Sequence, residues 1–219
     1  MGLDMYLEKV KRVKGMTLSQ IINTYDNYEA KKHDCTLEDW CGGNPDDVCE
    51  DREAEVMALY HESTPAWAWD NYTTKGIVEC IAYWRKANQI HNWFVNNIQN
   101  GEDDCGSYEV TKEELKVLLE TCKLVKESSK LVSSKVKNGY RMKEVNGEYI
   151  EDPIWEDGEV IEDTSVAEKW LPTTSGFFFG GTDYDQWYYE DIDNTITQLE
   201  IVLKETDFEN EIVFYNSSW

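Results

Sequence analysis

Apolar residues alternate with more polar ones near the start of the chain. Leu3, Met5 and Leu7 are separated by more polar neighbours, which predicts a strand with one buried face within residues 3–13. The apolar run within residues 211–215 predicts a second strand near the last residues.

The longest helical pattern is expected between Thr74 and Asn100. Residues recur there at alternating spacings of four and three, on one stripe that contains Ile77, Ile81, Trp84, Asn88, His91, Val95 and Ile98. Asn88 and His91 are therefore expected as polar groups on an apolar face. Such groups are costly to bury without hydrogen bonds, so either the fold satisfies them or they line a pocket.

Other patterns predict three further helices. Thr111 and Glu114 form a capping box, and the helix that they begin is expected to keep an apolar face as far as Val136 and to stop at Asn138-Gly139. A short helix is expected over residues 17–28. The last one carries an apolar face made of Tyr188, Ile192, Thr195, Leu199 and Val202.

The remaining segments predict strands and loops. Residues 140–162 are typical of a β-meander with turns at Asn146-Gly147 and Asp157-Gly158. Phe177, Phe178 and Phe179 predict a short buried strand that enters a loop. Residues 34–55 are acidic, carry cysteines and predict an irregular insertion.

Together these elements predict a single α+β domain over residues 1–219. About three main helices are expected to pack on a small, mostly antiparallel sheet. The acidic, cysteine-bearing insertion is placed at about residues 30–60, and the β-meander insertion at about 140–165.

The charge of the chain restricts its partners. The 219 residues carry a net charge of −23, which repels DNA, RNA and anionic membranes. Acidity commonly serves solubility, but a charge of this size exceeds what a soluble domain needs, which favours a partner with a basic surface. No apolar run approaches the length of a membrane span, and the first residues lack a signal-peptide pattern, so a cytoplasmic protein with reduced cysteines is expected.

Four residues of the acidic segment are candidate metal ligands: His33, Cys35, Cys41 and Cys49. Their spacings differ from the paired ligands of zinc sites, so no metal and no cofactor is predicted. The chain also lacks a P-loop, a dinucleotide-binding glycine motif, a nucleophile elbow and an H-E-x-x-H helix. An enzyme is therefore the less favoured class. A stripe of lysines between Lys112 and Lys137 is expected to be solvated or to offset the acidic segments.

Five segments resemble a family of uncharacterised proteins of bacteriophages and prophage-bearing bacteria. They are Met1–Leu7 (MGLDMYL), residues 83–91 (YWRKANQIH), residues 104–106 (DCG), and the pair 175–180 (SGFFFG) and 187–191 (WYYED). The resemblance implies no catalytic residues. It implies a phage or prophage product that works in the bacterial cytoplasm.

Three functions follow as hypotheses. The leading one is an accessory protein that binds and blocks a host protein, such as a defence protein, through its acidic surface. The second is a protein that binds or sequesters a nucleotide-like small molecule. Its candidate site contains Arg85, Asn88, His91, Phe178, Asp183, Trp187 and Tyr188, with Asp183 and Asp185 orienting the histidine. The third is an enzyme that uses His91 as its acid or base. For Asn88 and His91, the alternative is a purely structural role with hydrogen bonds to backbone.

Overall fold

The computed structural model describes residues 2–63, 74–145 and 148–219. In chain order its elements are β1 (Asp4–Lys11), α1 (Leu18–Lys32), α2 (Leu37–Cys41), the 3-10 turns η1 (Pro45–Asp47) and η2 (Glu50–Arg52), α3 (Glu53–Met57), β2 (His61–Ser63), β3 (Thr74–Gly76), β4 (Val78–Arg85), α4 (Asn88–Asn97), β5 (Tyr108–Glu109), α5 (Lys112–Ser128), β6 (Leu131–Val145), β7 (Glu148–Ile161), α6 (Ser165–Trp170), α7 (Gln186–Glu205) and β8 (Glu211–Ser218). Helices and antiparallel strands are mixed, as an α+β protein requires. The described residues form seven α-helices, so the expectation of about three is not confirmed.

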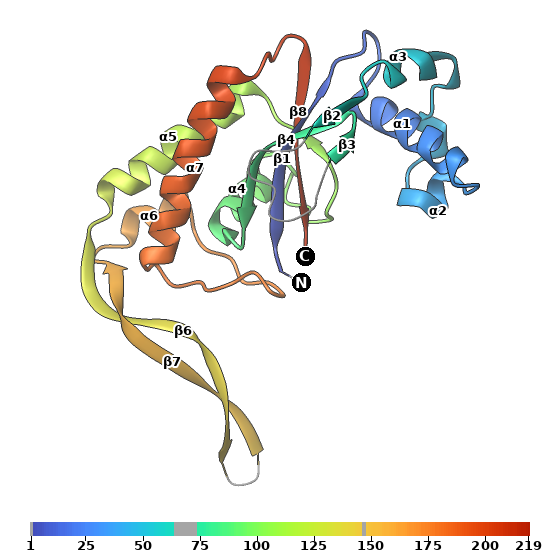
Figure 1. The fold of residues 1–219 in the computed structure, drawn as a ribbon. Helices are drawn as coiled ribbons and strands as arrows, with labels where there is room; N and C mark the ends of the chain where they lie inside the picture. Colours follow the sequence, from blue (N-terminus) through green and yellow to red (C-terminus); the bar gives the residue numbers. More distant parts are fainter. Residues whose placement is uncertain (1, 64–73, 146–147) are drawn as a thin grey trace.

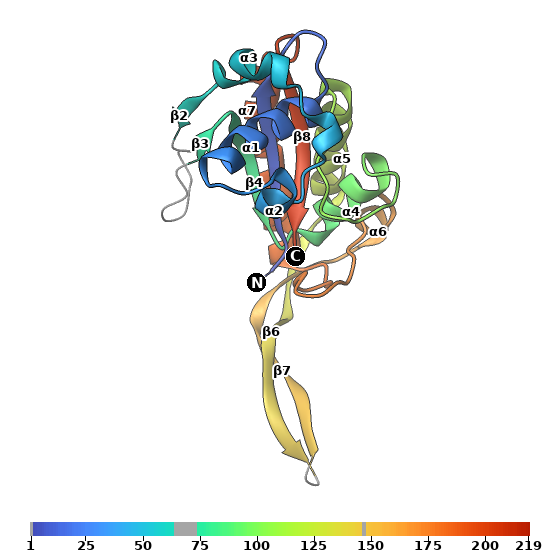
Figure 2. The same ribbon diagram turned by 90° about the vertical axis from the view of Figure 1, so that its right-hand side faces the viewer.

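The central sheet has the strand order β4-β1-β8-β5, and every neighbouring pair is antiparallel. Both predicted terminal strands are confirmed, and they pair with each other from Asp4 opposite Ser218 to Lys11 opposite Glu211. The two ends of the chain therefore lie side by side (Figures 1 and 2).

Each face of the sheet is covered by a different group of helices. In Figure 1, α4, α5 and α7 lie on one side of the sheet, and α1, α2 and α3 lie on the other. Val213 and Tyr215 of β8 belong to the larger hydrophobic core, while Ile212 and Phe214 belong to the smaller one. Because successive side chains of a strand point to opposite faces, β8 is buried on both sides.

Residues 78–85 correct the sequence prediction. They form strand β4, paired with β1, and not the first half of a helix from Thr74 to Asn100. Ala82 and Trp84 reach the larger core with a period of two. The apolar residues at 77, 81 and 84 suit a helical stripe equally well, because both faces of this strand are partly buried. The helix itself begins only at Asn88.

The helix predicted from the capping box begins as expected, since the Thr111 hydroxyl accepts from the amide of Glu114 and the Glu114 carboxylate accepts from that of Thr111. It ends at Ser128, however, and residues 131–145 continue as a strand. Val132 and Val136 follow the helical spacing, but β-branched residues favour a strand once a partner is available. Val136 lies opposite Glu156 of β7.

The predicted meander is a single long hairpin. Strands β6 and β7 pair from Leu131 opposite Ile161 to Val145 opposite Glu148, with an irregularity between Lys137 and Tyr140. Asp157-Gly158 lies inside β7, so the turn predicted there is wrong. The turn predicted at 146–147 lies outside the described residues. The hairpin projects away from the central sheet and its helices in both views (Figures 1 and 2).

The acidic segment folds mainly into short helical pieces, from α2 to α3, that pack near α1. The prediction of a helix over residues 17–28 is confirmed by α1, which extends to Lys32. The predicted last helix is α7. No helix in residues 2–63, 74–145 and 148–219 has both the length and the apolar character that a membrane span needs.

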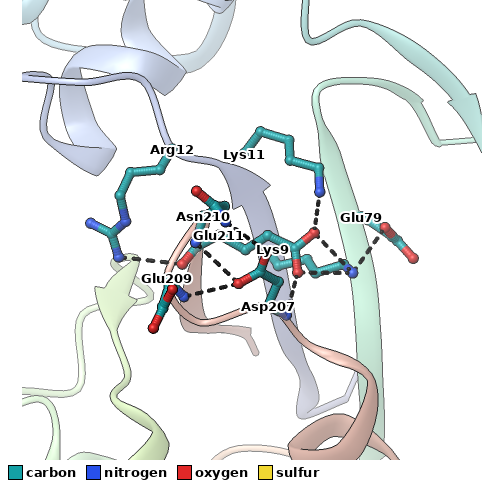
Figure 3. A network of polar contacts seen from close by, with 8 residues as sticks. All are labelled: Lys9, Lys11, Arg12, Glu79, Asp207, Glu209, Asn210 and Glu211. Carbon is teal, nitrogen blue, oxygen red and sulfur yellow. Dashed lines mark hydrogen bonds and ion pairs between the residues drawn. The ribbon is translucent and has the colours of Figure 1, made fainter.

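A buried carboxylate joins the ends of β1 and β8 (Figure 3). Glu211 accepts a hydrogen bond from Lys11 at 2.7 Å, from Lys9 at 3.3 Å and from the amide of Asp207 at 3.0 Å. Arg12 donates to the main-chain oxygen of Glu211. Burial opposes ionisation of Glu211, but these donors outweigh it and hold its pKa below the ordinary value.

Candidate functional site

Asn88 is the first residue of α4 and is buried. Its side-chain amide donates to the carbonyl oxygens of Phe179 at 3.2 Å and Gly181 at 2.7 Å, and its oxygen accepts from the amide of Thr174 at 3.0 Å. All three partners belong to the loop between α6 and α7. Asn88 therefore holds this loop against α4 through main-chain groups, as the structural alternative for this residue expects.

His91 makes hydrogen bonds to side chains instead. Its Nδ1 lies 2.8 Å from the hydroxyl oxygen of Tyr215, and its Nε2 lies 3.0 Å from Oδ2 of Asp103. The indole of Trp219 donates to the other Asp103 oxygen at 3.1 Å. Asp103 therefore orients the imidazole, and the expectation that Asp183 and Asp185 do so is wrong, because they lie beside the neighbouring hollow described below.

Two members of the Tyr215–His91–Asp103 hydrogen-bond chain, His91 and Asp103, line a hollow of about 350 Å³. Burial raises the pKa of Tyr215 well above its ordinary value, so its hydroxyl stays neutral. The ring of Phe179 meets His91 edge to face, with centroids 5.1 Å apart. These two hydrogen bonds fix the tautomer of His91. They also offer a path for a proton between the buried hydroxyl of Tyr215 and the partly exposed carboxylate of Asp103.

A second hollow, of about 460 Å³, lies where the hairpin joins the remainder of the protein. Its lining includes five of the seven residues selected from the sequence: Arg85, Asn88, Asp183, Trp187 and Tyr188. His91 lies at the other hollow. Six of the seven selected residues therefore line one of two neighbouring hollows.

Several of these side chains are held by partners. Arg85 lies 2.9 Å from the Asp4 carboxylate, and Asp183 lies 2.8 Å from the ammonium group of Lys137. The hydroxyl of Tyr188 donates to the carbonyl oxygen of Leu171 at 2.9 Å. Arg85 and Tyr188 are therefore fixed by contacts within the fold.

Asp191 and Gln89 also line this hollow, and sequence reasoning missed them as site residues. Gln89 is buried and donates to Oδ2 of Asp191 at 3.2 Å. Burial raises the pKa of Asp191 to about 7, against the lowering effect of Gln89. A carboxyl group that titrates near neutral pH beside a hollow is a common feature of functional sites. In the sequence, Asp191 is marked only by its position three residues after Tyr188, on the face of α7 that the fold buries. That position becomes informative only when the packing of α7 is known.

Phe178 lies apart from both hollows, and the buried strand predicted at 177–179 is absent. These residues form an irregular turn in which Phe177 and Phe178 are exposed and only Phe179 is buried. Phe178 has a φ of 65°, an uncommon conformation for a bulky residue.

The four candidate metal ligands do not form a metal-binding cluster. The ring of His33 stacks on Trp40 with centroids 4.8 Å apart. The thiols of Cys35, Cys41 and Cys49 each donate to a main-chain oxygen. Across the described ranges, no group of three or more His, Cys, Asp or Glu residues is placed to hold a metal ion.

The sequence predicts strands over residues 140–162, but it assigns no function to the β6–β7 hairpin that they form. Large apolar side chains are exposed along its outer part: Tyr140, Met142, Val145, Tyr149, Ile150, Ile154 and Trp155. A soluble protein normally covers so many neighbouring apolar groups, and a cluster of them marks a contact surface. Comparison with protein families, curated proteins and solved structures found no match.

Proposed function

We propose that this protein acts by binding another protein through the β6–β7 hairpin, and that the partner presents basic and apolar side chains. The observation that carries the proposal is a row of four large apolar side chains on one face of the hairpin. Tyr140, Met142, Tyr149 and Trp155 are between 54% and 70% exposed.

The strand register places these four side chains together. Tyr140 lies opposite Pro153, and Met142 lies opposite Glu151. Residues directly opposite in an antiparallel pair point to the same face, as do residues two apart along a strand. Along β7, Tyr149 is two residues before Glu151 and Trp155 is two residues after Pro153, so both point to the same face as Tyr140 and Met142. Tyr, Trp and Met are also the residues that protein interfaces concentrate at their centres.

The charges of the hairpin favour a basic partner. Two of its four cations are neutralised within the hairpin: Lys135 lies 2.7 Å from Asp157, and Arg141 lies 2.6 Å from Asp152. Lys143 takes part in no ion pair within the described ranges. Lys137 is taken by Asp183, outside the hairpin. Five carboxylates take part in no ion pair within the described ranges, namely Glu144, Glu148, Glu151, Glu156 and Glu159. Together with the net charge of −23, they attract a basic protein and repel nucleic acid.

The resemblance to phage and prophage proteins supports a host partner. On this proposal residues 1–219 act as one α+β domain in the bacterial cytoplasm, and the hairpin blocks a host protein, such as one of a defence system. Occupying a surface requires no chemistry. The proposal therefore assigns no catalytic residue.

Affinity capture from a bacterial lysate, at low salt and with the full chain as bait, tests this proposal. The test variant combines Tyr140→Ser with Trp155→Ser. The matched control combines Val117→Ser with Ile201→Ser, which removes two exposed apolar side chains from α5 and α7. A second test variant combines Glu148→Gln with Glu151→Gln and keeps the apolar face.

We expect one host protein to be captured by the wild type and the control and to be lost from the aromatic variant. The carboxylate variant should capture less of it, and added salt should release it, because screening weakens attraction between exposed charges. Equal capture by the aromatic variant and the wild type contradicts a role for the hairpin. Capture that is insensitive both to salt and to the carboxylate variant contradicts the basic partner.

A further inference from the structure

The hollow at the base of the hairpin differs in character from the hairpin's exposed face. Its walls come from the end of β4, the start of α4, the irregular part of the hairpin, the loop before α7 and the first turns of α7. Its volume of about 460 Å³ lies within the range of about 300–1,000 Å³ that is usual for small-molecule sites.

Most of the charged groups around it already have partners. Arg85 pairs with Asp4, and Lys137 pairs with Asp183. The carboxylate of Asp185 accepts from the amides of the two residues that follow Gln186 and so caps α7. These groups shape the hollow and are not available to a ligand without breaking a contact.

Besides the side chain of Asn138, three groups that could contact a ligand remain available within the described part of the chain. The ammonium group of Lys86 takes part in no ion pair or hydrogen bond there, and neither does the indole N–H of Trp187. Asp191 uses Oδ2 to accept from Gln89, while its other carboxyl oxygen has no partner among the described residues. The hollow therefore offers one cation, one flat aromatic ring and one acidic oxygen.

The backbone beside these groups is open at Gly181. Gly180 and Gly181 both line the hollow; a Cβ on Gly181 would meet nothing within 4 Å, whereas a Cβ on Gly180 would meet the Cβ of Lys86 at 3.2 Å. Gly139, on the hairpin side, is equally open. Glycine backbone without side chains allows a phosphate or another anionic group to approach closely.

From this arrangement we infer that the hollow binds a nucleoside monophosphate. The phosphate contacts Lys86 and the Gly181 backbone, the base stacks on Trp187, and an N–H group at the edge of the base donates to Asp191. A mononucleotide carries an anionic group, a flat ring and a donor edge in one molecule of suitable size. This site is separate from the exposed face of the hairpin, so it does not depend on the proposed protein partner.

Isothermal titration calorimetry on the full chain tests the inference. The probes are AMP, CMP, GMP and UMP, with adenosine and inorganic phosphate as partial ligands. We expect at least one nucleotide to bind at a single site, and both partial ligands to bind about tenfold more weakly or worse, since each lacks one set of contacts. If phosphate alone binds as tightly as every nucleotide, or none of the four nucleotides gives saturable heat, the inference is wrong.

Variants then locate the site. Asp191→Asn and Lys86→Gln should each weaken nucleotide binding by about tenfold or more. Lys204→Gln, near the far end of α7, is the matched control and should bind like the wild type. Gly181→Ala adds a methyl group towards open space, so it should fold normally and still weaken binding. Wild-type affinity in both Asp191→Asn and Gly181→Ala overturns the assignment. Capture by the aromatic hairpin variant is measured separately, so failure of one proposal leaves the other testable.

Discussion

The hydroxyl of Tyr215 lies 2.8 Å from Nδ1 of His91, and this contact joins the central strand β8 to helix α4 across 124 residues of sequence. Both side chains are buried, so the hydrogen bond is shielded from water. Tyr215→Phe should lower the free energy of unfolding by about 1–3 kcal/mol, because it leaves one imidazole nitrogen without its partner. Denaturant unfolding of Tyr215→Phe, His91→Gln and the double variant measures the coupling. Fully additive losses would show that the two residues do not act as a pair.

Asn88→Ala removes three hydrogen bonds to the loop between α6 and α7. The buried carbonyl of Phe179 and the partly buried groups of Gly181 and Thr174 then lack this partner, so we expect a loss of about 2–4 kcal/mol in the free energy of unfolding. Asn96→Ala, on the exposed side of α4, is the control and should change it by about 0.5 kcal/mol or less. A similar small effect for both variants would remove the structural role assigned to Asn88.

The lowered pKa of Glu211 predicts a specific dependence of stability on pH. A carboxylate whose folded pKa lies below its unfolded value of 4.5 contributes stability above that value, and the contribution disappears as the pH falls through the folded pKa. Glu211→Gln should therefore lose more stability relative to the wild type at pH 7 than at pH 3, as measured by denaturant unfolding. Glu205→Gln, at the exposed end of α7, should show no such difference.

The raised pKa of Asp191 predicts that stability changes with pH in the opposite direction. Its folded pKa of about 7 lies above the ordinary value of 3.8, so the folded state holds this proton more tightly than the unfolded state. The stability cost of ionising Asp191 is present above pH 7 and is relieved as the pH falls from about 7 towards 4. Asp191→Asn should raise the melting temperature at pH 8 more than at pH 5. An equal change at both values would indicate an Asp191 that is ionised in the same way in both states.

The sequence predicts elements well where a single periodicity acts alone. Strands β1 and β8, the capping box that begins α5, and α7 all match their patterns. Residues 78–85 fail because apolar residues on both faces of a buried strand also fit a helical stripe. The start of the hairpin is mispredicted because Val132 and Val136 continue the helical spacing of the apolar residues of α5. Only the pairing of β6 with β7 selects the strand.

The candidate site could be predicted only in part, for a related reason. Asn88 stands out in the sequence as a polar residue on an apolar stripe, and it lies with Arg85 and Asp183 around one hollow. Asp103, Asp191 and Lys86 gain their importance from neighbours distant in sequence. No local pattern separates these three residues from the other charged residues of an acidic chain.

The five unpaired carboxylates of the hairpin also affect whether copies of the protein associate with one another. A two-stranded ribbon leaves both outer edges with open backbone groups, and such edges readily recruit further ribbons into growing assemblies. Like charges on every copy oppose that stacking at neutral pH. Acid conditions, which protonate these groups, should remove this protection, so turbidity and fibril formation are expected to rise as the solution is acidified.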